Sequence, residues 1–314
     1  MKKIAAIIIV SFTAFTVLAF KKEPSYRQAR ISGAEAKIHL YIHDDDRIAI
    51  SNVYVKVFMG MNFRNKGYWI NGVTDANGHF LIQGKTCGDE VEIFISKNGY
   101  YDSCKKLCFA KMGEEYEVKD GKWIPYGCKN FIVLRKIANR IDLVKYNDFI
   151  DVPATNTWIG FDMERQSFVN PHGTGKVKDF EINVTWDGLP PWESKYCSAV
   201  LRFCDSLSGG YYIDNIIESK FPYPYKANVS NNFIEKKITI IDRADETYQT
   251  AVGFRNNSTL IIRTRCEVDE REELKNVNYG CLKRFDVGPG RRGSILRLSY
   301  VFNPIPNNTN LEAK

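Results

Sequence analysis

Three ionisable residues in the second half of the chain have types and spacing that suit acid–base chemistry. Asp162 and Glu164 are two residues apart, and His172 follows in the run Pro171-His172-Gly173-Thr174-Gly175. On a strand the two carboxylates share one face, and glycines allow a ligand to approach the backbone closely. Such a group is compatible with a hydrolase. Because the spacing names no nucleophile or substrate partner, this is the alternative hypothesis and not the leading one.

Sequence motifs of other catalytic classes are missing. The chain contains no G-x-S-x-G nucleophile motif, no H-E-x-x-H motif and no glycine-rich phosphate loop before a helix. The leading interpretation is therefore a non-catalytic binding or structural protein, and a hydrolase is the alternative. No cofactor is expected.

The four histidines do not indicate a metal site. His39 and His43 are four residues apart, and on a strand this separates them by roughly 13 Å, too far to share one ion. His79 falls in a predicted hairpin turn. The cysteines lack the C-x-x-C pairs that are typical of zinc sites. We therefore expect no bound metal.

The eight cysteines form two groups of four, one in each half of the chain. An even count in each half, behind an export signal, is typical of two domains that are each cross-linked by disulfides. Sequence cannot choose among the three pairings that each group permits, although Cys104 and Cys108 are close enough to bridge across a tight turn, and Cys87 could pair with either. We expect bridges only within each group, among Cys87, Cys104, Cys108 and Cys128, and among Cys197, Cys204, Cys266 and Cys281.

The N-terminus predicts export. Lys2 and Lys3 precede an uncharged run from Ile4 to Phe20, and Val17-Leu18-Ala19 places small residues where signal peptidase cleaves. Residues 1–19 are therefore expected to be a signal peptide, and an uncleaved anchor through residues 4–20 is the alternative. The protein is expected to be periplasmic, at the cell surface or secreted.

The charge distribution and the aromatic residues indicate which kind of partner the protein binds. The net charge of +7 comes from interspersed lysines, arginines and carboxylates, which favours a mixed solvated surface over a nucleic-acid-binding patch. Trp69 and Trp123 lie in predicted loops, where an aromatic ring can stack on a sugar or anchor a protein interface. They are the candidate ligand-binding residues, and the expected partner is a protein or a glycan at the cell envelope.

Apolar and polar residues alternate along much of the chain, for example in Lys37–Ile42 and Phe180–Trp186. Strands place successive side chains on opposite faces, so this pattern predicts an all-β protein with two antiparallel β-sandwiches. The first is expected at residues 36–137 and the second, containing disulfides, at residues 158–303, with a linker at 138–157. The proline-containing tail after residue 303 is expected to fray.

One segment has a family likeness. The turn Val73-Thr74-Asp75-Ala76-Asn77-Gly78-His79-Phe80 joins two strands, and a later strand ends in Lys97, Gly99 and Tyr100. A D-x-x-G-x-F turn followed by K-x-G-Y resembles the carboxypeptidase regulatory-like (transthyretin-like) domain over about residues 36–135. The resemblance implies a small seven-stranded sandwich that serves as an accessory module on exported or cell-surface proteins and has no catalytic residues.

The second half is similar to uncharacterised exported bacterial proteins. The residues that carry this likeness are Phe161-Asp162-Met163-Glu164 through the run from Asn170 to Gly175, and Arg263-Thr264-Arg265 through Asn278-Tyr279-Gly280. The resemblance implies no activity.

Overall fold

The chain folds into two compact units, referred to below as unit 1 and unit 2. Unit 1 extends to Lys136 and includes residues 218–220, and unit 2 comprises residues 137–217 and 221–314. The predicted signal segment (residues 1–19) and the alternative anchor (residues 4–20) lie outside the described residues. The computed structural model describes residues 26–60, 67–113, 115–189, 196–243, 254–255, 257–290 and 293–314.

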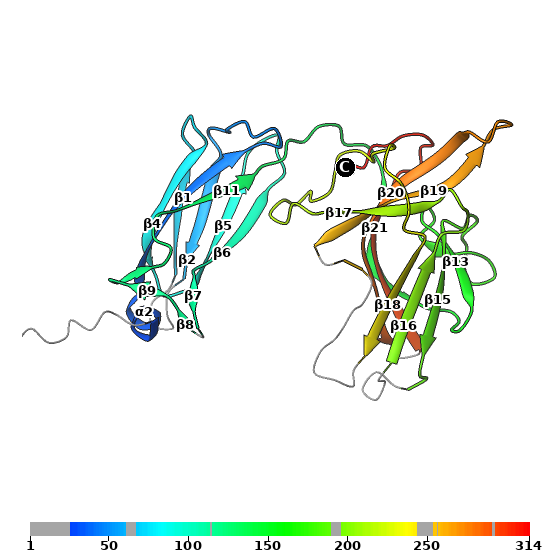
Figure 1. The fold of residues 1–314 in the computed structure, drawn as a ribbon, viewed down its shortest axis with the longest axis horizontal. Helices are drawn as coiled ribbons and strands as arrows, with labels where there is room; N and C mark the ends of the chain where they lie inside the picture. Colours follow the sequence, from blue (N-terminus) through cyan, green and yellow to red (C-terminus); the bar gives the residue numbers. More distant parts are fainter. Residues whose placement is uncertain are drawn as a thin grey trace, which may run out of the picture. The chain divides into compact units, whose positions relative to one another are not determined.

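The first sheet of unit 1 is built around β1 (Ala34–His43), in which every second residue is buried. Helix α2 (Tyr26–Ser32) precedes β1. β1 pairs antiparallel with β4 and parallel with β11, so this sheet is mixed and not purely antiparallel. The remaining strands of the sheet are β4 (His79–Thr86), β11 (Cys128–Val133), β9 (Val118–Lys119) and β10 (Lys122–Trp123) (Figure 1).

The second sheet of unit 1 is antiparallel and lies against the first. Buried side chains of both sheets, among them Leu40 and Val57, form one apolar core. Its strand order is β3 (Tyr68–Val73), β2 (Tyr54–Met59), β5 (Glu90–Ser96) and β6 (Ser103–Cys108), and β7 (Lys111–Met112) pairs separately with β8 (Glu115–Tyr116).

The turn before β4 forms as the sequence predicts. Asp75 Oδ1 accepts hydrogen bonds from the backbone N–H groups of Asn77 and His79. Gly78 has φ +68°, and a Cβ atom there would lie 2.4 Å from the carbonyl oxygen of Ile42. Only glycine fits both restraints.

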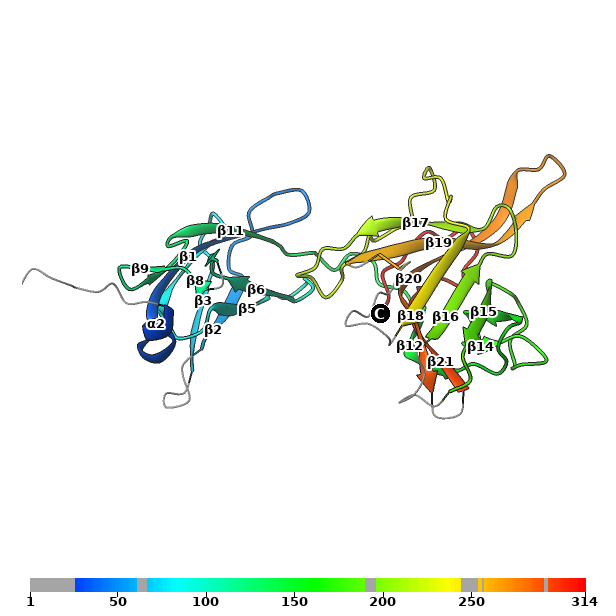
Figure 2. The same cartoon turned by 60° about the horizontal axis from the view of Figure 1, so that its bottom comes forward.

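Unit 2 consists of two antiparallel sheets around a second apolar core that includes Phe161, Phe180 and Leu298. Figure 2 shows β18, β16 and β15 side by side. One sheet has the order β14 (Ser167–Phe168), β13 (Trp158–Asp162), β15 (Phe180–Trp186), β16 (Tyr196–Arg202) and β18 (Lys237–Arg243); the other has the order β12 (Val144–Asp151), β21 (Gly293–Phe302), β20 (Leu274–Gly290), β19 (Ser258–Val268) and β17 (Gly209–Asp214). The predicted all-β class with two sandwiches is confirmed.

Two predicted boundaries of unit 2 are corrected. The expected linker at residues 138–157 contains β12, which pairs along its length with β21. The tail after residue 303 does not fray, because Glu312 is 1 % exposed and its carboxylate accepts the backbone N–H groups of Ala138 and Asn139. Across the described ranges, no helix has the length and apolar character needed to span a membrane.

Candidate functional site

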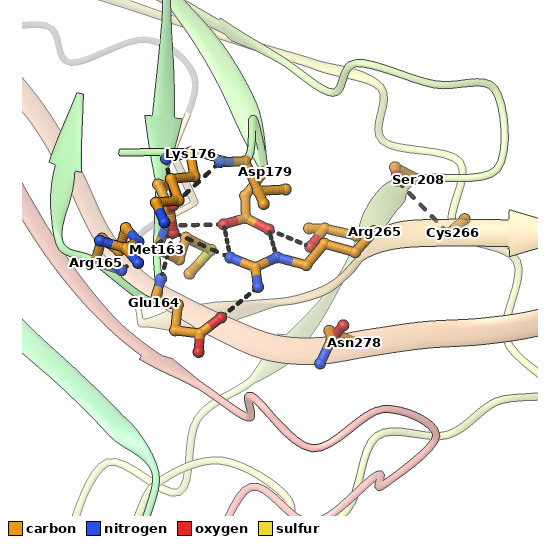
Figure 3. Close-up of polar contacts among 12 residues, drawn as sticks. Met163, Glu164, Arg165, Lys176, Asp179, Ser208, Arg265, Cys266 and Asn278 are labelled. Carbon is orange, nitrogen blue, oxygen red and sulfur yellow. Dashed lines mark hydrogen bonds and ion pairs between the residues drawn. The ribbon is translucent and has the colours of Figure 1, made fainter. Parts of the chain in front are cut away.

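The predicted acidic pair of unit 2, Asp162 and Glu164, lies in a network centred on Arg265. Figure 3 shows Glu164 and Asp179 at the Arg265 guanidinium. Asp162 is the last residue of β13, whereas Glu164 lies in the turn that follows, so the expected single strand through both residues is not formed. The Arg265 guanidinium makes a bidentate contact with Asp179 through Nε and Nη2, at 2.9 and 3.0 Å. It also bonds Asp162 at 3.0 Å and pairs with Glu164. The Thr264 hydroxyl donates to Asp179.

A bulge in β19 aims Arg265 at this network. The pairing of β19 with β20 shifts register between Thr264 and Glu267, and Arg265 has φ +53°. A bulge redirects a side chain that regular alternation would place elsewhere, and a positive φ at a residue with a Cβ carries a strain of about 1–3 kcal/mol. Arg265 thereby links β19 in one sheet to β13 in the other.

The surroundings of Asp162 and Arg265 favour the charged form of each side chain. Burial alone would raise the pKa of Asp162, but backbone N–H donors and the Arg265 guanidinium outweigh it and lower that pKa below its ordinary value. Burial likewise opposes the charge of Arg265, but hydrogen bonds and ion pairs with Asp179, Glu164 and Asp162 raise its pKa. Asp162 and Asp179 have side chains that are 2 % and 0 % exposed.

Asp162 has no acceptor capacity left for a substrate. A carboxylate offers about four lone-pair positions, and five N–H donors already bind its two oxygens: the backbone amides of Glu164, Arg165, Lys176 and Val177, and the guanidinium of Arg265. A catalytic acid also needs a raised pKa, which Asp162 lacks. His172 is exposed, and within the described residues no hydrogen bond or ion pair joins its imidazole to Asp162 or Glu164. The network is a structural cross-link between sheets.

A thiol near this network is equally unsuited to catalysis. The Ser208 hydroxyl lies within hydrogen-bond distance of Cys266 Sγ, at 3.5 Å (Figure 3). The backbone N–H of Ser208 donates to Asp205. Burial raises the pKa of the Cys266 thiol, although the Ser208 hydrogen bond and the cations of Arg263 and Lys236 oppose this. A nucleophilic cysteine needs the opposite shift.

The predicted disulfides are absent. No disulfide joins any two of the eight cysteines, all of which lie among the described residues. Cys104 and Cys108 occupy one strand, β6, with no turn between them, and four strand residues span roughly 13 Å, beyond disulfide reach. In unit 2, Cys197 faces the core, whereas Cys281 precedes the core residue Leu282 on β20 and therefore faces away from it.

The two candidate ligand-binding tryptophans differ in their exposure to solvent. Trp123 is 0 % exposed, and its indole Nε1–H donates to the carbonyl of Thr86 at 2.9 Å. It packs against Phe109 in the core of unit 1, so the expectation that Trp123 contacts a ligand is wrong. Trp69 lies on β3, not in a loop, and is 44 % exposed.

Trp69 belongs to a cluster on the outward side of its sheet. Phe58 lies opposite Trp69 across the β2–β3 pairing, and the two ring centroids are 5.0 Å apart. Phe94, from β5, lies 5.8 Å from Trp69. Tyr54 is two residues from Lys56, whose Nζ atom lies 4.1 Å from the centre of the Trp69 ring. We call the side chains of Tyr54, Phe58, Trp69 and Phe94 the aromatic face.

A polar hollow continues the aromatic face at one end. It has a volume of about 550 Å³. Tyr54 lines it and lies directly opposite Ser96 in the β2–β5 pairing, two residues along from the Lys56–Phe94 pair. Its walls are Asn52, Tyr54, Ser96, Lys97, Asn98 and Asp102. The sequence signal for this surface is the alternation of β2 and β5, in which the outward-facing Tyr54, Phe58 and Phe94 are aromatic where polar residues are usual.

Comparisons with known proteins show no family for the chain. No family model and no curated protein matches it. Among solved structures, 3-chlorocatechol 1,2-dioxygenase from Rhodococcus opacus 1CP aligns at 14% identity and TM-score 0.26 over 34% of this chain and 61% of the dioxygenase. Chlorocatechol 1,2-dioxygenase from Pseudomonas putida aligns at 10% identity and TM-score 0.25 over 33% of this chain and 60% of that one.

A third structure is aligned over more of its length. It is a protein from Bacteroides fragilis NCTC 9343 described as membrane-associated and of unknown function, with 10% identity and TM-score 0.20 over 88% of this chain and 100% of that chain. The matches thus span about three fifths of the two dioxygenases and all of the third protein. At these scores none supports an argument about activity.

Proposed function

We propose that this chain is an exported, non-catalytic binding protein of the cell envelope whose unit 1 binds a glycan on the aromatic face. The observation that carries the proposal is the exposure of Tyr54, Trp69 and Phe94, at 44, 44 and 37 %, on one side of one sheet. Large apolar side chains gathered on an open surface mark an interaction site. Export is supported by the basic and then apolar N-terminal segment, which would attach the protein to a membrane if it were not cleaved.

The chemistry of the surface favours a glycan over a protein. The core of a protein interface is depleted of charged residues, whereas Lys56 lies over the ring of Trp69 within the aromatic face. Sugar rings combine apolar C–H faces, which suit aromatic rings, with hydroxyl groups that need hydrogen-bond partners. The hollow beside Tyr54 supplies amide, hydroxyl, carboxylate and ammonium groups for them.

The saturated carboxylate of unit 2 supports a non-catalytic role. Asp162 is ionised and fully hydrogen-bonded, and Glu164 is engaged by Arg265. Because Arg265 binds both carboxylates and His172 lies outside this network, the three residues of the hydrolase alternative are not assembled as an acid–base group.

A glycan array followed by calorimetric titration of the best glycan tests the proposal. The protein is residues 20–314, and the variants are Trp69→Ala and Phe94→Ala. The matched control is Phe131→Ala, because Phe131 is 58 % exposed but belongs to β11 in the other sheet. Loss of a stacked ring should weaken binding at least about ten-fold, or about 1.4 kcal/mol.

The outcomes are distinct. Weaker binding in both aromatic-face variants, with Phe131→Ala unchanged, supports the proposal. Glycan binding that is indifferent to Trp69→Ala contradicts the assigned surface. A blank array, together with capture of an envelope protein that Trp69→Ala abolishes, replaces the glycan with a protein partner.

A further inference from the structure

Two histidines meet on the outward face of the first sheet of unit 1, away from the aromatic face. In the β1–β4 pairing His39 lies opposite Leu81, and Tyr41 lies opposite His79. His39 and His79 are therefore diagonal neighbours on adjacent strands, within reach of long side chains. Their 40-residue separation hides this contact from the sequence.

The distance between the two imidazoles suits a shared metal ion. Nδ1 of His39 lies 3.0 Å from Nε2 of His79, and the ring planes are inclined by only 20°. Two imidazole nitrogens that bind one ion at about 2.0–2.1 Å lie roughly 2.9–3.4 Å apart for angles between square-planar and tetrahedral. The present nitrogen–nitrogen distance therefore already suits one shared ion, which would replace the proton between the rings once the rings rotate toward it.

Asp75 is placed to orient one of these ligands. Its Oδ1 atom is fixed by the turn, and its Oδ2 atom lies 3.7 Å from Nδ1 of His79. A carboxylate beside the far nitrogen is the usual neighbour of a metal-binding histidine, because a hydrogen bond to it holds the proton there and leaves Nε2 as the ligand atom. A small rotation of the Asp75 or His79 side chain would close the 3.7 Å gap to such a hydrogen bond.

We propose that His39 and His79 bind one divalent transition metal ion, of the class of Cu(II), Ni(II) and Zn(II), with Asp75 as a positioning residue. Imidazole suits these three ions. Among the described residues no group of three or more His, Cys, Asp or Glu side chains is arranged to hold a metal. The pair is thus a two-ligand site, weaker than a four-ligand structural zinc site, and its other coordination positions take water or a donor atom from a bound molecule.

Copper(II) is the probe, because it binds such sites most tightly among the divalent ions. The full chain, without a histidine tag and with accessible thiols alkylated, is titrated by calorimetry, and the bound ion is examined by electron paramagnetic resonance. His43 and His172 are the remaining histidines of the chain. Their alanine variants are matched controls.

The proposal expects one bound ion per chain with spectral coupling to two imidazole nitrogens. His39→Ala and His79→Ala should each remove one coupled nitrogen and weaken binding by more than about ten-fold, and Asp75→Asn should weaken it about ten-fold. The two control variants should bind as the wild type does. A wild-type spectrum with fewer than two imidazole nitrogens, or an equal loss in His43→Ala or His172→Ala, overturns the site, even if a variant of the pair fails to fold. Wild-type affinity in Asp75→Asn overturns the positioning role.

Discussion

Truncation of Arg265 tests whether the ion network stabilises unit 2. The Arg265 side chain is 16 % exposed, and its partners Asp162 and Asp179 are 2 and 0 % exposed. Removal of one partner from a buried ion pair leaves an uncompensated charge and costs about 3–5 kcal/mol. Backbone amides still bind both carboxylates in the variant, so Arg265→Ala should cost about 3 kcal/mol, at the lower end of that range. In a unit of this size the midpoint of thermal unfolding then falls by about 6–12 °C.

Urea unfolding followed by tryptophan fluorescence measures this loss. The matched control is Arg284→Ala, because Arg284 pairs with Asp286 at the surface, where the two side chains are 47 and 37 % exposed, and such a pair contributes about 0–1 kcal/mol. Arg265→Gly should be more stable than Arg265→Ala by up to about 1 kcal/mol, because glycine tolerates the positive φ. A loss in Arg265→Ala no greater than in Arg284→Ala would refute the reasoning.

Three further outcomes follow from the same geometry. The pKa of folded Asp162 is below the ordinary 3.8, so the stability that its carboxylate contributes is complete above pH 3.8 and is lost as the pH falls through the folded pKa. Urea midpoints measured from about pH 5 to 2 should therefore fall less steeply in Asp162→Asn than in the wild type. Parallel curves would contradict this expectation. Trp123→Ala should destabilise unit 1 by about 3–5 kcal/mol, but the molecules that remain folded should bind the glycan as tightly as the wild type. Weaker glycan binding by folded Trp123→Ala would show that Trp123 belongs to the binding site. Gly78→Ala should cost at least about 1 kcal/mol in thermal unfolding, because its Cβ atom would meet the Ile42 carbonyl, and an unchanged midpoint would argue against the turn geometry.

The strands that sequence predicts best are those with one buried side. β1 alternates between buried and half-buried residues along its length, and β15 does so from Phe180 to Val184. The residue types themselves show this pattern. β12 was missed because it lies at a sheet edge and none of its residues is fully buried. The sequence of such a strand resembles that of a polar connector, and its pairing partner, β21, is too far along the chain for a local pattern to reveal the pairing.

Side-chain placement was harder to predict than strand placement. The sequence places Trp123 in a loop, but in the structure it is buried. Its indole N–H bonds the carbonyl of Thr86 and its ring stacks on Phe109, and neither residue is a near neighbour in sequence. Arg265 contacts Asp162 and Asp179 because a bulge in β19 redirects its side chain. The alternation of apolar and polar residues does not predict that bulge. Sequence spacing grouped Asp162 with Glu164, but it could not show that an arginine about a hundred residues away binds both carboxylates.

The aromatic face is tested most directly by the indole N–H signals in a nitrogen–proton correlation spectrum of the chain. Trp69 is exposed on the aromatic face, and Trp123 is a buried internal control whose N–H is bonded to Thr86. On titration with the glycan that binds best, the Trp69 signal should shift in proportion to occupancy while the Trp123 signal stays in place. Binding that leaves the Trp69 signal unmoved would contradict the account.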